Sequence, residues 1–378
     1  MLVAIDGRTL AGRSVRGIGR YVFNLLRCWP AEAEPPVVLY DSAAAEGRRP
    51  HLPEGSLARL EGFSMPLSRW RSWTLLAEPW HLRRLAADVF HAPGNLAPLW
   101  QPAPTVVTLH DAMLWEQARD LPDRPRWYYD RLQPRAYRKA RAIITVSHYS
   151  RERLEHCFPF LEGRIRVIYH GIEPRFRPME LTEAAWSALA GYGLRRPFVL
   201  VLGGDLERKR VSFAVETFAR AHAGRPVEHQ LAVAGLRDIG RERLRGQVET
   251  LNLTPHVVAL PFVADEHMPL LYSAAAAVMY PSAGEGFGFP LLEAMACGAA
   301  CMTSRATSLP EIAGDGALVL GPDDQAAWVE NLRSLLGGGL RWDERRAATL
   351  RQAGRFDWEK AVSETFDIYR LVAEGGSL

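Results

Sequence analysis

The sequence Gly284-Glu-Gly-Phe-Gly-Phe-Pro-Leu-Leu-Glu293 places two carboxylates around a glycine-rich turn, directly after a predicted strand at 277–280. The glycines let backbone N–H groups come close to a ligand, and Pro290 suits the first position of a helix. Unpaired N–H groups at that helix start can bind an anion or a sugar, while Glu285 and Glu293 accept hydrogen bonds from its two ends. A plain glycine turn, with Glu293 in the first helical turn at the positive end of the helix, explains the same residues.

A second candidate site follows the strand predicted at 198–202, in the sequence Gly203-Gly-Asp-Leu-Glu-Arg-Lys-Arg210. Glycines after a parallel strand, followed by Arg208 and Lys209, suit a diphosphate, because arginine can bind two oxygens at once and lysine supplies a compact charge. The alternative is a solvated basic helix start. Cations at that end oppose the helix dipole, so the position favours a bound anion.

Two weaker candidates lie in the first half of the chain. Gly12, Gly17 and Gly19 form a glycine-rich turn after the first predicted strand, but their spacing does not match the dinucleotide-binding pattern G-x-G-x-x-G. His110 ends the strand predicted at 105–109, where a histidine can donate or accept a hydrogen bond near neutral pH. A flexible loop and a structural histidine are the respective alternatives.

Several other chemistries are excluded by motifs that the sequence lacks. It contains no H-E-x-x-H, no G-x-S-x-G, no phosphate-binding G-x-x-x-x-G-K-[ST] and no D-x-D pair to hold a metal on a diphosphate. Its four cysteines, Cys28, Cys157, Cys297 and Cys301, are too few for a disulfide scaffold and lack zinc-knuckle spacing. We therefore expect no bound metal, no resident cofactor and a reducing, cytoplasmic setting.

Length and composition are those of a globular protein with its own core. Of the 378 residues, 48% are apolar and 24% are charged, and no apolar run reaches the roughly 18–20 residues that span a membrane. The first 172 residues carry 24 basic and 17 acidic residues, whereas the remainder carries 22 and 26. Because the second half is net acidic, nucleic acid is a poor partner.

Short apolar runs alternate with longer amphipathic segments, which predicts parallel sheets covered by helices on both faces. The predicted strands are 2–6, 37–40, 89–91, 105–109, 142–146 and 166–169 in the first half, and 198–202, 230–234, 257–260, 277–280, 300–303 and 317–320 in the second. The predicted helices are 19–29, 73–86, 127–140, 147–157, 211–221, 241–251, 290–296, 325–336 and 341–353.

This pattern predicts two doubly wound, Rossmann-like α/β domains that face a cleft, with ligands at the carboxyl ends of the strands. The first domain spans 1–172 and the second 197–356. Between them, 173–196 is rich in proline, glycine and charge and is expected to be a linker with a short helix.

Taken together, these motifs resemble those of the retaining glycosyltransferases of family 4, which have the GT-B fold, and the resemblance covers nearly the whole chain. The pair Glu285 and Glu293 is similar to that family's signature, and Arg208-Lys209 resembles its diphosphate-binding basic pair. Weaker likenesses are ITVSHYS at 144–150, IYHGIEP at 168–174 and FDWEKA at 356–361.

Within the family, the chain looks most like the mannosyltransferase branch. The residues that carry this likeness are Ile5-Asp-Gly-Arg8, Arg16-Gly-Ile-Gly-Arg-Tyr21 and Phe90-His-Ala-Pro93. The likeness implies GDP-mannose as the sugar donor and a glycan or lipid-linked acceptor, in the biosynthesis of a cell-surface polysaccharide, lipopolysaccharide or glycolipid. It also implies a transfer with retained configuration that needs no metal.

The resemblance implies a role for each candidate residue. Glu285 and His110 bind and orient the donor sugar, Glu293 binds the nucleotide ribose, and Arg208 and Lys209 neutralise the leaving diphosphate. Contacts of the glycine loops to sugar and phosphate are implied for Gly17, Ile18, Gly19, Gly204, Gly286, Phe287, Gly288 and Phe289.

The resemblance also assigns the domains and shows one departure. It makes 1–172 the acceptor domain, 197–356 the nucleotide-sugar domain and 357–378 a helix that crosses back to the first domain. The departure is Asp205, which stands where the family has a basic residue after the phosphate-loop glycine.

Two segments of the first domain combine basic and aromatic residues. Residues 124–141 contain seven basic residues and one acid with Trp127, Tyr128, Tyr129 and Tyr137, and residues 69–84 contain four arginines with Trp70, Trp73 and Trp80. Basic residues with interfacial aromatics suit an anionic membrane surface, so we expect peripheral docking at the inner leaflet of the plasma membrane. A solvated helix face with its apolar residues turned to the core is the alternative.

Other functions stay open at this point. The same transfer with a UDP-sugar or TDP-sugar donor changes only the base and the sugar, and a nucleotide-sugar epimerase can use the same fold without an acceptor. A non-catalytic binding protein does not explain why Glu285, Glu293, Arg208 and Lys209 are all present. A dinucleotide oxidoreductase ranks last because its glycine pattern fails.

Overall fold

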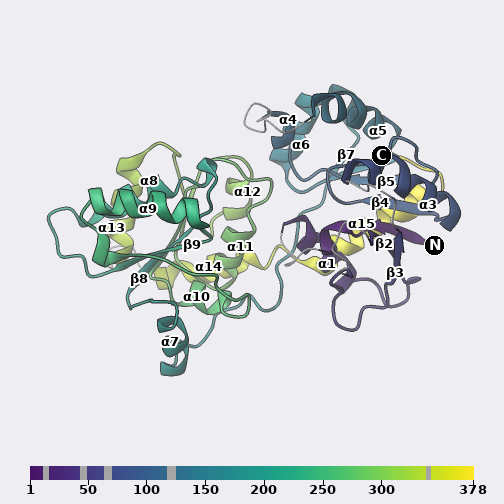
Figure 1. Ribbon diagram of the computed structural model, residues 1–378. Helices are drawn as coiled ribbons and strands as arrows, with labels where there is room; N and C mark the ends of the chain where they lie inside the picture. Colours follow the sequence, from purple (N-terminus) through teal and green to yellow (C-terminus); the bar gives the residue numbers. More distant parts are fainter. Residues whose placement is uncertain (12–16, 43–48, 64–69, 117–124, 338–341) are drawn as a thin grey trace. The chain divides into compact units, whose positions relative to one another are not determined.

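The computed structural model describes residues 1–11, 17–42, 49–63, 70–116, 125–337 and 342–378. They form two compact units (Figure 1), one made of Met1–Gly171 with Asp357–Leu378 and the other of Ile172–Phe356. Each unit is built around one parallel sheet, with helices before and after its strands. This confirms the predicted class of two Rossmann-like α/β domains.

The first unit contains a seven-stranded sheet in the order β3-β2-β1-β4-β5-β6-β7, and its neighbouring strands pair in parallel. The strands are β1 (Val3–Asp6), β2 (Val37–Asp41), β3 (Arg59–Phe63), β4 (Val89–Ala92), β5 (Thr105–Thr108), β6 (Ala142–Thr145) and β7 (Ile165–Val167). The sequence did not predict β3, because this edge strand is partly exposed and lacks the buried apolar run of the central strands.

The first unit has α-helices before and after its strands. They are α1 (Ile18–Arg27), α2 (Trp70–Ser72), α3 (Glu78–Leu85), α4 (Met113–Glu116), α5 (Gln133–Lys139), α6 (His148–Cys157) and α15 (Trp358–Ala373). Short π-helices at Trp73–Ala77 and Trp127–Leu132 precede α3 and α5. Pro79 and Pro134 lie at the starts of α3 and α5. A proline has no N–H to donate to the carbonyl group four residues earlier, so the regular α-helix does not extend to the residues before it.

The second unit contains a six-stranded parallel sheet in the order β10-β9-β8-β11-β12-β13. Its strands are β8 (Phe198–Leu202), β9 (Gln230–Ala234), β10 (Val257–Ala259), β11 (Ala277–Tyr280), β12 (Cys301–Ser304) and β13 (Leu318–Leu320). The chain order reverses between β8 and β11, which are neighbours. The loops after these two strands therefore lie at a topological switch point, where doubly wound sheets bind their ligands.

Helices cover both faces of this second sheet (Figure 1). They are α7 (Glu183–Ala190), α8 (Val211–His222), α9 (Asp238–Thr250), α10 (Met268–Ala274), α11 (Phe289–Ala296), α12 (Leu309–Ala313), α13 (Gln325–Leu336) and α14 (Trp342–Ala353). On one face, Phe218 of α8 and Trp328 of α13 pack with Val199 and Val201 of β8 in a buried cluster. The alternate residues of β8 thus anchor the helix that follows the candidate diphosphate loop.

The division of the chain differs from the predicted linker at 173–196. That segment belongs to the second unit, because its residues pack and bond there. The Tyr192 hydroxyl lies 2.7 Å from His267 Nδ1, and Gln230 Nε2 donates to Gly193 O. The two ends of the second unit meet where Ile172 N donates to Phe356 O over 2.9 Å.

Helix α15 belongs to the first unit, although the second unit precedes it in the chain. It lies against β4, β5 and α1, and its Tyr369 hydroxyl is 2.6 Å from His91 Nδ1. Among the described residues, no helix has the length and apolar character needed to cross a membrane.

Candidate active site

The loop between β11 and α11 is held in place by the segment after β12. Thr307 Oγ1 accepts from Glu285 N over 3.1 Å, and Ser308 Oγ donates to the carbonyl oxygens of Glu285 and Phe287. Gly288 caps α11 with φ of 110°, and a Cβ there would lie 2.9 Å from Leu309 Cδ2. Only glycine fits that combination of backbone angle and space, so the loop is preorganised at the start of α11.

The carboxylate of Glu285 binds its neighbours through one oxygen. Oε1 accepts from Ser282 Oγ at 2.5 Å, from Lys209 Nζ at 2.6 Å and from Tyr280 OH at 2.8 Å, and lies 3.1 Å from Arg208 Nη1. Among the described contacts, none ends on Oε2. The second oxygen is therefore the one available to a ligand hydroxyl.

Arg208 and Lys209 reach Glu285 because a short 3-10 helix, Glu207–Lys209, precedes α8. Arg208 O accepts from Ala283 N over 2.7 Å, and the Arg208 guanidinium donates to Gly284 O. Both basic residues thus lie before α8 rather than in its first turn, and they bridge the two glycine-rich loops. The structure brings together the first and second candidate sites of the sequence.

The charges in this cluster depend on one another. Burial lowers the pKa of Lys209, and Glu285 opposes that change. Burial also acts against the ionised form of Glu285, but Lys209 and Arg208 outweigh it and lower the pKa of that carboxyl. The cluster therefore contains two cations and one anion near neutral pH. This leaves a net positive charge next to the start of α11, as an anionic ligand requires.

Asp205, the departure noted in the sequence, turns away from this cluster. Its Oδ1 accepts from Arg237 N over 3.0 Å at the start of α9, and a Cβ on Gly240 would lie 2.2 Å from the same oxygen. Asp205 therefore stabilises the positive end of α9. Gly204 lies beside Lys209, whose Cγ would be 3.5 Å from an added Cβ.

Glu293 lies one residue further into its helix than the sequence predicted. Helix α11 begins at Phe289, so Glu293 is its fifth residue, and the helix has no acidic residue in its first turn. The explanation by a favourable helix dipole at the first turn is therefore wrong. Glu293 is only 4% exposed, and Tyr272 OH donates to its Oε2 over 2.8 Å.

The aromatic residues of the loop pack inward. The Phe287 ring lies 5.2 Å from that of Phe289 and 5.8 Å from that of Phe356, measured between ring centroids, and Phe287 is 5% exposed. Contacts from Phe287 to a ligand must therefore come mainly from its backbone. Gly286, in the same loop, is half-buried.

The other candidates belong to the first unit. Gly17 caps α1 with φ of 52°, and a Cβ there would meet no atom of the described residues within 4 Å. Residues 12–16, which include Gly12 and the first part of the glycine turn, lie outside the described residues. Phosphate binding by the backbone at Gly17 stays a prediction.

His110 is a buried, neutral histidine just after β5. Its Nε2 lies 2.8 Å from Pro93 O, and because a carbonyl only accepts, Nε2 carries the hydrogen and Nδ1 is the acceptor. Burial lowers the pKa of His110 to about 4, and its exposure is 9%. A neutral imidazole with an acceptor nitrogen can orient a hydroxyl group, but it does not act as a cation.

The sequence missed the hydroxyl groups that support both carboxylates. Tyr280 and Ser282 follow one another around Pro281 at the end of β11, and Tyr272 lies in α10. Polar atoms at the carboxyl end of a parallel strand were the available signal for Tyr280 and Ser282. For Tyr272 there was none, because α10 was not predicted.

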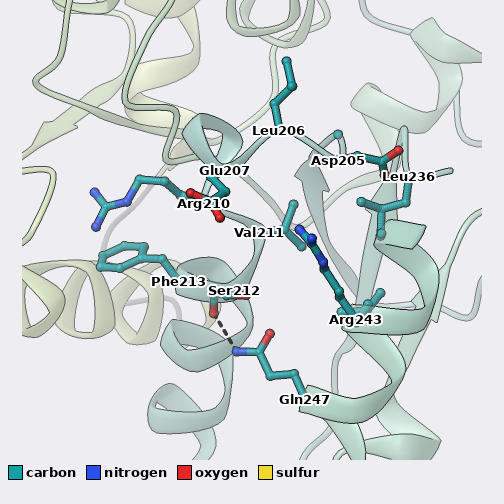
Figure 2. Close-up of a pocket in the computed structure, with 13 residues that line it drawn as sticks. Asp205, Leu206, Glu207, Arg210, Val211, Ser212, Phe213, Leu236, Arg243 and Gln247 are labelled. Atoms are coloured by element: carbon teal, nitrogen blue, oxygen red, sulfur yellow. Dashed lines mark hydrogen bonds between the residues drawn. The ribbon is translucent and has the colours of Figure 1, made fainter. Parts of the chain in front are cut away.

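A separate pocket of about 380 Å³ lies between α8 and α9. Figure 2 shows Arg243 and Gln247 on one wall and Phe213 on the other, with Gln247 Nε2 donating to Ser212 O over 3.0 Å. Arg210 turns towards Phe213, and its guanidinium contacts Asp323 Oδ1 at 2.7 Å. The pocket lining includes Gly204 but not Lys209 or Glu285, so we do not assign this pocket to the site described above.

No group of three or more His, Cys, Asp or Glu side chains is arranged to hold a metal ion among the residues that the structure describes. The cationic groups found at the site are the side chains of Arg208 and Lys209.

Comparison with known families gives two matches that together cover most of the chain. Residues 15–176 match the family model described as Glycosyltransferase Family 4, and residues 196–337 match the one described as Glycosyl transferases group 1. The second match contains the Glu285 cluster and the first contains His110.

The chain is also similar to characterised enzymes. It is 29% identical to the O-antigen chain mannosyltransferase B of Escherichia coli over 370 residues, which is 94% of this chain and 96% of that protein. It is 28% identical to the MMP alpha-(1->4)-mannosyltransferase of Mycolicibacterium hassiacum over 255 residues, 65% of this chain and 57% of that protein.

Solved structures share the fold. Sucrose-phosphate synthase from Thermosynechococcus elongatus has a TM-score of 0.76 at 19% identity, covering 99% of this chain and 100% of that one. WaaG, a glycosyltransferase involved in lipopolysaccharide biosynthesis, has a TM-score of 0.73 at 17% identity, covering 98% and 99%.

Proposed function

We propose that this chain, which belongs to glycosyltransferase family 4 and has the GT-B fold, transfers mannose from GDP-mannose to a glycan or lipid-linked acceptor. The enzyme is a glycosyltransferase. The observation that carries the choice of site is the Glu285 carboxylate, whose Oε1 is engaged by Lys209, Tyr280 and Ser282 while Oε2 has no contact among the described residues.

The relatives support mannose as the sugar and a polysaccharide as the product. The O-antigen chain mannosyltransferase B of Escherichia coli matches 94% of this chain. The serotype-specific mannosyltransferase WbdA of Escherichia coli is 26% identical over 276 residues, or 33% of that longer protein. We infer the same sugar and the same kind of product for this chain.

In the proposed reaction, the donor's glycosidic C1–O bond breaks and a new C1–O bond forms to an acceptor hydroxyl on the same face. The acceptor proton moves to the leaving diphosphate, so GDP departs and the configuration is retained. Lys209 and Arg208 neutralise charge that grows on the diphosphate in the transition state. Glu285 Oε2 accepts from a hydroxyl of the sugar, and Glu293 binds the ribose.

The first unit contributes the remaining roles. The start of α1 at Gly17, Ile18 and Gly19 offers backbone N–H groups to a phosphate. The Nδ1 atom of His110 accepts from a sugar hydroxyl. Because these residues and the Glu285 cluster belong to different units, each role needs its own variant to test it.

Transfer assays test the donor. The enzyme is incubated with GDP-mannose, UDP-glucose, UDP-N-acetylglucosamine or a TDP-deoxy-sugar, each with a radiolabelled sugar, and with a lipid extract of bacterial membranes as acceptor. We expect label in the product from GDP-mannose only. Label from a UDP-sugar or TDP-sugar keeps the reaction class and replaces the donor, and no label from any donor contradicts the proposal.

Incubation of each donor without acceptor separates the transferase from an epimerase on the same fold. A transferase leaves the sugar unchanged, whereas an epimerase converts it with no lipid present. Proton NMR of the anomeric signal also shows whether the product keeps the donor's configuration.

We further propose that the first unit docks on an anionic membrane surface. Leu76 is 59% exposed and Trp80 45% exposed on one stretch of helix, with Arg84 stacked on Trp80 at 4.7 Å. Trp100 is exposed beside Arg83, and Trp127 is exposed at the start of the other basic segment. Exposed tryptophans flanked by arginines fit the headgroup region of an anionic leaflet.

Part of the predicted aromatic set does not support docking. Trp73, Tyr128 and Tyr137 are buried in the core of the first unit, as the alternative explanation required. The side chain of Trp70, along with residues 69 and 124, lies outside the described residues.

Vesicle sedimentation tests the docking. At low salt we expect binding to vesicles with phosphatidylglycerol and none to phosphatidylcholine vesicles, with loss of binding in Trp80→Ala. Ile239→Ala is the control, because Ile239 is an apolar residue of the second unit that is 65% exposed, more than Trp80. Equal binding to neutral and anionic vesicles contradicts the docking proposal.

A further inference from the structure

Tyr280 is the last residue of β11, and its hydroxyl group lies between the two opposite charges of the site. Lys209 Nζ is 2.9 Å from Tyr280 OH, which is 2.8 Å from Glu285 Oε1. Lys209 Nζ also reaches Glu285 Oε1 directly at 2.6 Å. The three side chains form a closed triangle of hydrogen bonds, and the tyrosine ring is 1% exposed.

The chemistry of the three groups fixes the direction of each bond. An ammonium group only donates and a carboxylate only accepts, so Tyr280 accepts from Lys209 and donates to Glu285. Burial, with Glu285 beside it, raises the pKa of Tyr280 well above its usual value, so the hydroxyl keeps its proton. One hydroxyl group thus stabilises the charged form of both neighbours.

We propose that Tyr280 is a positioning residue of the transfer reaction, whose hydroxyl group holds the Lys209 cation and the Glu285 anion in place and in their charged forms. This inference rests on the proposed function, since it assigns Tyr280 to the site that binds the nucleotide sugar. Tyr280 need not touch the donor itself.

The other charged groups around the triangle remain when the hydroxyl is removed. Arg208 Nη1 lies 3.1 Å from Glu285 Oε1, and Glu293 acts on Tyr280 through space. In Tyr280→Phe, the ring still fills its buried position while Lys209 loses an acceptor and Glu285 loses a donor. The pKa of Lys209 then falls and that of Glu285 rises.

Two neighbouring hydroxyl groups provide matched controls. Ser282 Oγ donates to Glu285 Oε1 but has no bond to Lys209 among the described contacts. Tyr272, equally buried, donates to Glu293 Oε2 over 2.8 Å. Ser282→Ala therefore removes one hydrogen bond to the Glu285 carboxylate. Tyr272→Phe removes a tyrosine hydroxyl group that bonds to the Glu293 carboxylate instead.

The lysine titration tests the proposal without any turnover. The chain has three lysines, Lys139, Lys209 and Lys360, so lysine labelled with ¹³C and ¹⁵N gives few NMR signals, and Lys209→Ala identifies the one needed. We expect Lys209 to titrate about one pH unit lower in Tyr280→Phe, a tenfold change in proton affinity, and to stay unchanged in Tyr272→Phe. An unchanged Lys209 titration in a folded Tyr280→Phe protein overturns the proposal.

The pH dependence of kcat then shows whether the charges matter to transfer. With the donor that the native enzyme uses, we expect the plot of kcat against pH to be narrower for Tyr280→Phe, because the acid limb moves to higher pH and the alkaline limb to lower pH. We also expect the maximum kcat to fall about tenfold or more. We expect Ser282→Ala to move only the acid limb of the plot, because Ser282 bonds to Glu285 and not to Lys209. We expect Tyr272→Phe to raise KM for the donor and to move neither limb. A drop in kcat that is equal at all pH values indicates packing alone and overturns the proposal.

A third variant covers the case in which Tyr280→Phe does not fold. Tyr280→Met fills the buried position with an unbranched apolar side chain that has no hydroxyl group, so we expect Lys209 to titrate lower than in the native protein, as in Tyr280→Phe. A native Lys209 titration in a folded Tyr280→Met protein contradicts the role of the hydroxyl. If the native enzyme turns over no donor, the proposed function fails, while the lysine titration still decides on Tyr280.

Discussion

At the scale of single residues, Lys209 is the side chain on which the proposed chemistry depends most. It is one of three lysines, and it is held by Glu285 and Tyr280 at the switch point of the second sheet. Its ammonium group donates to Glu285 Oε1 over 2.6 Å. A bound diphosphate supplies more negative charge at the same place, so Lys209 can be shared between Glu285 and the ligand.

We expect Lys209→Ala to lower the transfer rate at least a hundredfold, because a cation that meets charge formed in the transition state is lost. Thermal unfolding should change little, since Arg208, Tyr280 and Ser282 still bind Glu285. Lys360→Ala, at an exposed lysine of α15, is the control and should keep full activity. An unchanged rate in Lys209→Ala refutes the diphosphate role.

The residues around Lys209 show what the sequence could and could not predict. Glycine spacing after predicted strands indicated Glu285, Arg208 and Lys209, and the structure places all three in contact. The role of Tyr280 could not be predicted from sequence. A tyrosine at the end of a buried strand looks like any other core residue until the hydrogen-bond partner of its hydroxyl group is known. The predicted start of α11 was wrong by one residue, which moves Glu293 from the first turn to the position just after it, because helix boundaries are uncertain by one or two residues.

At the scale of elements, the start of α11 is the part of the site with the tightest backbone requirement. Gly288 has φ of 110° and no room for a Cβ beside Leu309, and the backbone of the loop is bound by Thr307 and Ser308. The helix can offer its N–H groups to a ligand only while this loop keeps its shape.

We predict that Gly288→Ala lowers the free energy of unfolding by about 1–3 kcal/mol and weakens donor binding, because strain and a side-chain clash act together. Gly163→Ala is the control: Gly163 has φ of 73° and open space around it, so only backbone strain applies there, about 1 kcal/mol. Urea unfolding measures the free energy of unfolding of each variant, and titration with the donor measures its donor binding. Equal losses in the two variants would show that the clash with Leu309 has no effect.

Elements without a strong pattern were the ones that the sequence missed. The central strands are uninterrupted apolar runs, and β8, β9 and β11 were predicted to the residue. The edge strand β3 has only exposed and half-buried residues, and α10 and α12 span only seven and five residues. Short elements leave too few residues for a periodicity to be recognised.

At the scale of the whole molecule, the buried histidines of the first unit link its stability to pH. Burial lowers the pKa of His91 to about 3 and that of His110 to about 4, and lowers the pKa of His170 well below its usual value. The unfolded chain binds protons near pH 6.5, whereas the folded unit does not until the pH is much lower. These residues therefore contribute full stability above pH 6.5 and lose it as the pH falls.

His91→Gln tests this contribution, because glutamine does not titrate and its amide group can take the place of His91 Nε2 opposite Thr108. Between pH 7.5 and pH 5, the free energy of unfolding should fall by about 2 kcal/mol less in the variant than in the native protein. Glu78, whose pKa burial raises, acts in the opposite direction but equally in both proteins. Identical losses in the two proteins contradict the assignment of a neutral, buried His91.

The proposed chemistry uses Arg208 and Lys209 in place of a metal. We therefore predict full transfer activity in excess EDTA with no added divalent ion. A complete loss of activity that is restored by magnesium or manganese contradicts this prediction.

The central claim is that the site around Glu285 and Lys209 binds GDP-mannose, and a thermal shift experiment without metal tests it most directly. The native protein is heated with GDP, UDP, ADP or TDP and their common sugar conjugates. A ligand at a hundredfold excess over its Kd stabilises the native state by about 2.7 kcal/mol. We predict a clear rise in Tm with GDP and GDP-mannose alone, lost in Lys209→Ala; a rise with another nucleotide instead, or with none, contradicts the claim.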